Sequence, residues 1–131
     1  MSGLTETHYQ LIIQKCHGAG IDAIWEMFNP RHCRWTKFPA TLTETVELRK
    51  EAFMATLERM LADGVIKLHK DGRILNNEIK ELIQNWRNAW PTTEAPYPTA
   101  PDIDFSLWFF DKSCPAGVAW RQPDGSYQIA D

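Results

Sequence analysis

Segments with β-strand character are concentrated in residues 104–130, and this placement constrains the fold more than any other feature. The segments FSLWFF, GVAWR and SYQIA are rich in aromatic and β-branched residues, and QPDG places Pro and Asp-Gly where a tight turn needs them. A segment below about 40 residues rarely folds alone. We therefore expect these strands to form a small antiparallel sheet that packs on the preceding chain.

Helix signals occupy the part of the chain before residue 91. The patterns predict helices from Thr5 to Gly18 and over residues 21–28, 41–64 and 78–90. Thr41 and Glu44 have the spacing of a capping box, and Gly64 stands where a helix-terminating glycine belongs. The predicted fold class is α+β, with N-terminal helices packed against a small C-terminal antiparallel sheet.

The 131 residues are expected to form a single domain over 1–131, with a helical part at 4–90, a Pro-rich connection at 91–103 and strands at 104–130. Asp71-Gly72 inside VIKLHKDGRIL predicts a hairpin, which either joins the sheet or forms a separate ribbon. The predicted core consists of Ile12, Ile13, Trp25, Phe28, Phe53, Leu57, Leu61, Ile79, Leu82, Ile83, Trp86, Leu107, Phe109, Val118 and Trp120.

Bulk properties favour a cytoplasmic protein with reduced thiols. The chain has three cysteines, an odd number, and shows no signal peptide and no apolar run long enough to span a membrane. The net charge of −3 is unevenly placed, because residues 94–131 hold two basic and six acidic residues. Such asymmetry can steer a partner of opposite charge, or it can be a solvated acidic face.

Cys114 is the first candidate for chemistry. A catalytic cysteine needs a nearby histidine or a helix N-terminus to lower its pKa. Cys114 instead precedes Pro115 in a predicted bend, and no helix begins there. We interpret it as a small buried packing residue, and we expect Cys114→Ser to leave function intact at some cost in stability.

A metal site and an enzyme active site are both disfavoured by residue spacing. The pairs Cys16-His17 and His32-Cys33 offer zinc ligands, but adjacent residues on a helix point about 100° apart. Asp102, Asp104 and Asp111 are close in sequence, yet no nucleophile or phosphate-binding motif accompanies them. The chain is therefore expected to have no catalytic residues, no metal and no cofactor.

The hairpin at 65–75 suggests a nucleic-acid contact. Lys67, Lys70 and Arg73 give it the basic character of the wing of a winged-helix domain. However, no convincing recognition helix precedes it, and the chain is acidic overall, whereas DNA-binding domains are usually basic. A nucleic-acid-binding regulator that uses these three residues is the alternative hypothesis.

The C-terminal stretch resembles a family of small bacterial proteins of unknown function. The shared pattern is an aromatic strand, a Cys-Pro-Ala-Gly bend, a strand containing Trp and an Asp-Gly-Ser turn, and the resemblance covers roughly residues 44–130. Its matching residues are Trp108, Phe109, Phe110, Asp111, Cys114, Pro115, Ala116, Gly117, Trp120, Asp124 and Gly125. Some members of this family resemble immunity proteins of polymorphic or contact-dependent bacterial toxins.

This resemblance implies a non-enzymatic binding protein of the immunity type, which neutralises a bacterial toxin by protein–protein contact. An acidic face would speed association with a basic toxin, and an exposed aromatic residue would hold the complex. The residues expected to contact the partner are Asp102, Asp104, Asp111, Asp124 and Trp35. The oligomeric state stays open.

Overall fold

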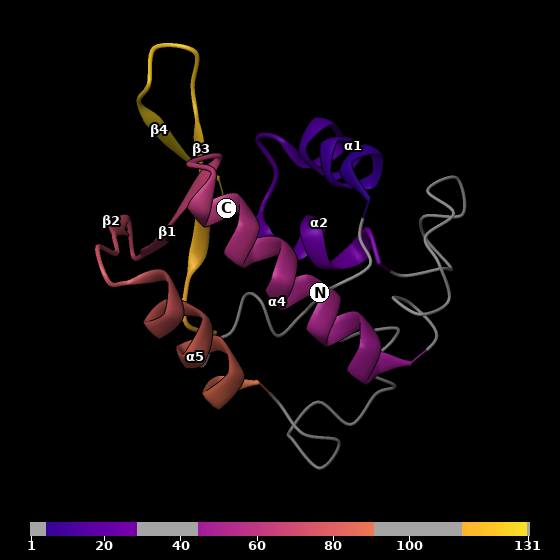
Figure 1. Ribbon diagram of the computed structural model, residues 1–131. Helices are drawn as coiled ribbons and strands as arrows, with labels where there is room; N and C mark the ends of the chain where they lie inside the picture. The colour runs from indigo at the N-terminus through magenta and orange to yellow at the C-terminus, as the bar shows by residue number, and fades with distance from the viewer. Residues whose placement is uncertain (1–4, 29–44, 91–113, 131) are drawn as a thin grey trace.

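The computed structural model describes residues 5–28, 45–90 and 114–130, in which helices come first and an antiparallel sheet is completed at the C-terminal end (Figure 1). The expected α+β class is confirmed. The described helices are α1 (Glu6–Cys16), α2 (Ile21–Glu26), α4 (Val46–Ala62) and α5 (Ile79–Ala89). The strands are β1 (Ile66–Lys70), β2 (Arg73–Ile74), β3 (Gly117–Arg121) and β4 (Tyr127–Ala130).

The helix ends follow their capping residues. The Thr5 hydroxyl accepts a 3.1 Å hydrogen bond from the amide of His8, as the sequence predicts for the start of α1. The predicted capping box at Thr41 is wrong, because α4 begins at Val46. Thr45 has an extended backbone (φ −126°, ψ 161°) and its side chain accepts a 3.0 Å bond from the amide of Leu48. A helix starting at Thr41 cannot continue through that conformation.

The 65–75 hairpin joins the sheet instead of forming a separate ribbon. The strand order is β2-β1-β3-β4, so β1 lies inside the sheet and pairs antiparallel with β3. Asp71 (φ 53°) and Gly72 (φ 84°) both take left-handed conformations, as the two-residue turn between β1 and β2 requires. The predicted strand FSLWFF at 105–110 lies outside the described residues.

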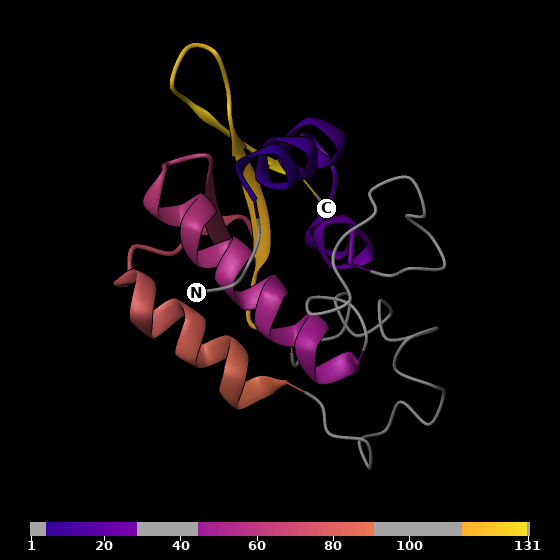
Figure 2. The ribbon, with the colours of Figure 1, turned by 45° about the vertical axis from the view of Figure 1, so that its right-hand side comes forward.

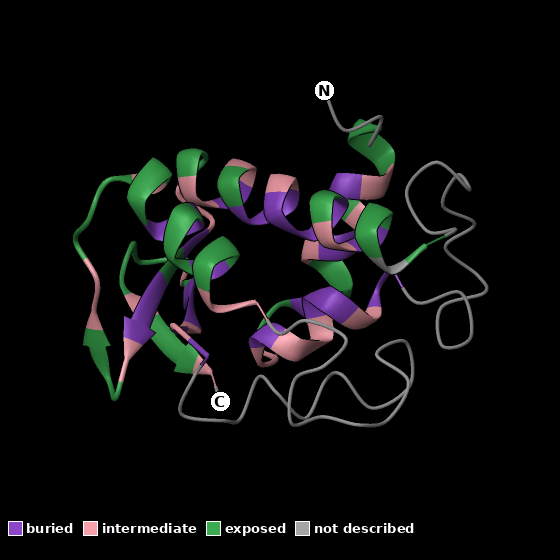
Figure 3. Ribbon diagram, turned by 90° about the horizontal axis from the view of Figure 1, so that it is seen from below, coloured by how far each residue is buried: buried purple, intermediate pink, exposed green. Residues whose placement is uncertain are grey.

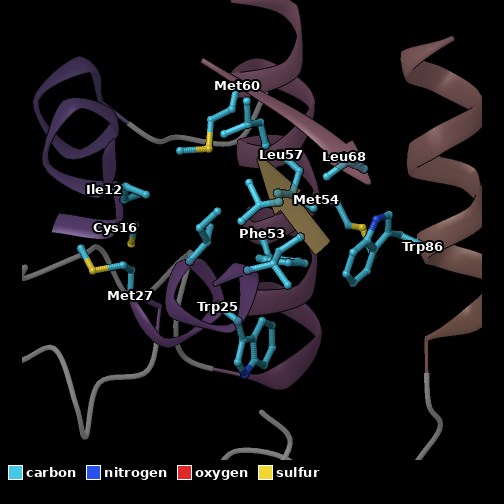
Figure 4. Close-up of a cluster of buried hydrophobic side chains, with 14 of the residues drawn as sticks. Ile12, Cys16, Trp25, Met27, Phe53, Met54, Leu57, Met60, Leu68 and Trp86 are labelled. Carbon is cyan, nitrogen blue, oxygen red and sulfur yellow. The ribbon is translucent and has the colours of Figure 1, made fainter. Parts of the chain in front are cut away.

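The other described helices pack on both sides of α4. α5 lies alongside α4, and α1 and α2 lie on the other side of α4 (Figures 1 and 2). Buried residues line the inner faces of these elements and exposed residues their outer faces (Figure 3). The ring of Phe53 on α4 lies 5.7 Å from the Trp25 ring and 5.8 Å from the Trp86 ring, both edge-on (Figure 4). Phe53 therefore joins α2 and α5 to α4 through aromatic packing.

The predicted core is largely confirmed, including Phe53, Leu57 and Trp86 at its centre. Ile13, Leu61 and Ile79 are partly buried and pack against the core cluster, and Leu107 and Phe109 lie outside the described residues. The predicted core residues that are buried are Ile12, Trp25, Phe28, Phe53, Leu57, Leu82, Ile83, Trp86, Val118 and Trp120. None of the helices in the described ranges is both long and apolar enough to cross a membrane.

A polar cluster joins α1 to the C-terminal end of α4. The buried Tyr9 hydroxyl donates a 2.9 Å hydrogen bond to the Asp63 carboxylate. The Arg59 guanidinium lies 3.7 Å from the centre of the Tyr9 ring and also bonds to Glu6. Burial, followed by the bond to Asp63, raises the pKa of the Tyr9 phenol. The bond to Arg59 lowers the pKa of the exposed Glu6 carboxyl.

Candidate binding surface

Of the residues expected to contact a partner, only Asp124 lies within the described residues. Trp35, Asp102, Asp104 and Asp111 lie outside them. Asp124 is exposed at the turn between β3 and β4, where its carboxylate accepts hydrogen bonds from the hydroxyl (2.6 Å) and the amide (2.9 Å) of Ser126. These bonds lower the pKa of the Asp124 carboxyl. Asp124 therefore stabilises the turn that joins β3 to β4.

The three basic residues of the β1–β2 hairpin do not form one patch. Successive side chains of a strand point to opposite faces of the sheet. Lys70 shares the face of the buried Leu68, and its ammonium donates a 2.7 Å bond to the carbonyl oxygen of Cys114. Arg73 pairs with Lys70 in register, whereas Lys67 lies on the other face.

Cys114 occupies a packing position in the described part of the structure. It is 3% exposed, and its thiol lies 3.5 Å from the carbonyl oxygen of Ala116, the acceptor in a weak hydrogen bond. The bond from Lys70 to the Cys114 carbonyl fixes the backbone just before β3. The buried position predicted from the sequence is confirmed.

The two Cys-His pairs, whose spacing disfavours them as zinc ligands, are only partly within the described ranges. Cys16 is buried, whereas the neighbouring His17 is exposed, and His32 and Cys33 lie outside the described residues. Among the residues that can be placed, no three His, Cys, Asp or Glu side chains come together as a metal site.

β4 lies at one edge of the four-stranded sheet, and some of its backbone groups point away from β3. The amide of Gln122 donates to the carbonyl of Ser126 at 2.7 Å, and opposed residues of an antiparallel pair alternate between bonded and non-bonded pairs. The bonded pairs are therefore Trp120–Gln128 and Val118–Ala130. It follows that the backbone N–H and C=O groups of Tyr127 and Ile129 point away from β3, toward the outer edge.

Side chains at this edge are uncharged and include a large apolar group. Ile129 is 42% exposed, and Gln128 is also exposed. Natural proteins usually protect an edge strand with charges, proline or a bulge. Because the stretch from Tyr127 to Ala130 contains no charged residue and no proline, its sequence does not discourage pairing with another strand.

The outer face beside this edge carries two cations. Arg121 and Tyr127 are paired in register, and Lys67, Ala119 and Ile129 form the next row across the sheet. Lys67 and Arg121 are exposed, and the Lys67 ammonium lies 4.8 Å from the centre of the Tyr127 ring. The Tyr127 hydroxyl donates a 2.7 Å bond to the carbonyl oxygen of Gly64, which fixes the ring beside Lys67.

A pocket of about 270 Å³ lies on the other side of β4, at the end of α1. The imidazole of His17 lies 5.2 Å from the Trp120 ring, and the Trp120 indole donates a 2.8 Å bond to the carbonyl oxygen of Ala19. We call this the His17 pocket. Its walls are His17, Gly18, Trp120, Gln122, Gln128, Ile129 and Ala130.

Together, Arg121, Tyr127, Gln128, Ile129, Lys67 and the His17 pocket form the candidate surface, which we call the β4 edge. The residues predicted to contact a protein partner include none of these, whereas Lys67 is one of the three predicted nucleic-acid contacts. The signal available in the sequence was SYQIA, a strand segment with no charge and no proline. Its position at the outside of the sheet depends on strand order, which local pattern does not specify.

Comparison with known proteins matches the part of the chain that contains most of this surface to a sequence family. The profile of a family described as "Protein of unknown function, DUF596" matches residues 61–129, which contain α5, β1, β2, β3 and all but the last residue of β4. No curated protein matches the sequence. A solved structure, an uncharacterized protein conserved in bacteria from Neisseria meningitidis, is similar with a TM-score of 0.68. Its identity to this chain is 21%, over 93% of this chain and 86% of that chain, so the likeness shows the fold.

Proposed function

The chain belongs to DUF596, a family of proteins of unknown function, and we propose that it is a non-enzymatic binding protein of the immunity type. It neutralises a bacterial toxin by direct protein–protein contact in the cytoplasm. The C-terminal motif resembles a family in which some members resemble immunity proteins, and this suggests the partner. The β4 edge suggests how contact is made.

The observation that carries this proposal is the exposure of Ile129 on an edge strand whose outward backbone groups belong to Tyr127 and Ile129. Such an edge is a template for an added strand, in which main-chain hydrogen bonds supply affinity. Exposed apolar area next to it supplies further contact on association. A binding role therefore fits the geometry at β4.

In the described residues, the ionisable groups with shifted pKa values form hydrogen bonds and ion pairs that stabilise the fold. Two bonds from Arg87 hold the Glu51 carboxylate at 2.7 and 2.9 Å, joining α5 to α4. Tyr9 and Asp63 join α1 to α4, and Asp124 is bonded within its own turn. Each of these groups stabilises the scaffold that presents β4.

The nucleic-acid hypothesis ranks second. A phosphate-binding patch needs several cations on one face. Lys67 and Lys70 instead lie on opposite faces of β1, and the Lys70 ammonium already bonds to the Cys114 carbonyl. A nucleic-acid site on the β1–β2 hairpin therefore has less structural support than a protein-binding site at the β4 edge.

The test is co-expression with the C-terminal domain of the protein encoded immediately upstream. We expect that domain to stop growth alone, and the wild-type chain to bind it and restore growth. Ile129→Lys should lose protection, because a charge on the edge opposes strand addition. Leu48→Lys is the matched control, since Leu48 is a large apolar residue with similar exposure (37%) on α4.

Two results would overturn the proposal. One is failure of the wild-type chain to bind the domain or to protect the cell. The other is salt-dependent binding of duplex DNA that is lost when Lys67, Lys70 and Arg73 are replaced by alanine, which would favour the nucleic-acid regulator.

A further inference from the structure

We infer that the partner segment bound at the β4 edge is an extended strand with a carboxylate side chain opposite Tyr127 and an apolar side chain opposite Ile129. This inference rests on the proposed function and specifies the chemistry of its partner. It follows from the register of β3 and β4, the positions of two cations and the pocket beside Gln128.

The backbone sets the first requirement. Only an extended segment can bond in turn to the outward N–H and C=O groups of Tyr127 and Ile129, which recur at every second residue of β4. Strand alternation then places the segment's side chains opposite Tyr127 and Ile129 on the outer face. The side chain between them points to the opposite face.

Charge sets the second requirement. Arg121 and Tyr127 lie in one row, so a side chain opposite Tyr127 continues that row. Neighbouring strands are about 4.8 Å apart, so Arg121 and that residue are separated by about 10 Å at the backbone. Extended arginine and glutamate side chains together span this distance. Lys67, whose ammonium lies 4.8 Å from the centre of the Tyr127 ring, adds a second positive charge to this face of the sheet.

The neighbouring row sets the third requirement. Ile129 follows Lys67 and Ala119 across the sheet, and 42% of its surface is exposed. An apolar side chain opposite it removes that surface from water. Directly opposed apolar pairs are favourable units of sheet pairing.

The His17 pocket accounts for the side chain between these two. Gln128 forms part of its wall, so the partner residue opposite Gln128 points toward it. At about 270 Å³, the pocket has room for an uncharged side chain against Gln128 and the buried Trp120. The partner pattern is therefore acidic, uncharged and apolar at three consecutive positions.

The experiment uses the full chain and a probe peptide, acetyl-Thr-Glu-Thr-Val-Thr-Glu-Thr-amide. This sequence reads the same in both directions, so it offers Val to Ile129 and Glu to Tyr127 whether it adds parallel or antiparallel. The control peptide has lysine at both glutamate positions. Binding is followed by backbone amide NMR shifts, at low and high salt.

We expect the glutamate peptide to shift the amides of residues 127–130 and to bind at least about tenfold more tightly than the lysine peptide. The preference should weaken with added salt. Arg121→Glu should reverse it, whereas Arg73→Glu, an exposed charge on the opposite edge strand, should leave it unchanged. Thermal melting of both variants checks that they fold.

Shifts centred away from β4, or equal binding of the two peptides, would overturn the inference. So would a dimer of the wild-type chain in sedimentation that Ile129→Lys converts to monomer, because a second copy would then occupy the edge. Toxin protection is measured separately. Protection without acidic-peptide binding defeats only this inference, and peptide binding without protection defeats only the proposed function.

Discussion

The Tyr127 hydroxyl donates a 2.7 Å hydrogen bond to the carbonyl oxygen of Gly64, across 63 residues of sequence. Gly64 ends α4 with a left-handed backbone (φ 74°), and its carbonyl lies at the turn into β1. The bond therefore joins β4, the outermost strand, to the turn between α4 and β1. It holds Tyr127, the first residue of β4, in place.

Replacing this tyrosine tests that anchor. Tyr127→Phe keeps the ring beneath Lys67 but removes the hydroxyl, so we expect the free energy of unfolding to fall by about 0.5–1.5 kcal/mol. Urea unfolding monitored by tryptophan fluorescence measures the change. An unchanged unfolding free energy would show that the Gly64 contact does not stabilise the fold.

Tyr9 should make stability fall at high pH. Burial and the bond to Asp63 raise the pKa of its phenol above the usual value of 10.0. The folded state therefore prefers the protonated phenol. This stabilisation is fully present below pH 10 and is lost as pH rises above it. Urea unfolding from pH 8 to 11 should show a steeper decline for the wild type than for Tyr9→Phe. Parallel declines would contradict this assignment.

The Glu51–Arg87 pair should stabilise the fold to an extent that depends on pH in the acidic range. The Arg87 bond lowers the pKa of the Glu51 carboxyl below 4.5, so its contribution is present above that pH and lost as pH falls further. Because both side chains are partly exposed, we expect a coupling of only about 0.5 kcal/mol at pH 7. A double-mutant cycle with Glu51→Gln and Arg87→Gln measures it. Equal coupling at pH 7 and pH 3 would refute the charge-based explanation.

Cys114 should behave as a packing residue. We expect Cys114→Ser to lower the unfolding free energy by about 1–3 kcal/mol, because a hydroxyl replaces a buried thiol, and to leave partner binding unchanged. Cys114→Ala is the matched variant, because it adds no polar group. Alkylation of the native thiol at neutral pH should be slow. Fast alkylation together with an unchanged melt of Cys114→Ser would indicate a reactive cysteine instead.

Local chemistry made much of the fold predictable. The Asp71-Gly72 turn, the Thr5 cap and the periodic spacing of Leu82, Ile83 and Trp86 each specify structure within a few residues. Competing caps were harder to resolve. Thr41 and Thr45 both suit a helix start, and the structure uses Thr45.

The candidate surface was much less predictable, because it depends on pairing between distant segments. β1 pairs with β3 at Leu68–Val118, fifty residues apart, and this pairing leaves β4 at the edge. One feature of this surface, the face of the sheet on which Lys67 lies, could be predicted from the sequence. The alternation that buries Ile66 and Leu68 already places Lys70 on their face and Lys67 on the other.

The most direct test of strand addition at β4 is amide hydrogen exchange in the chain bound to the C-terminal domain encoded upstream. Gln128 and Ala130 serve as internal controls, because their amides already face β3. We predict that exchange at Tyr127 and Ile129 slows by at least about tenfold on binding, while Gln128 and Ala130 change little. Unchanged exchange at Tyr127 and Ile129 in a stable complex would contradict the account.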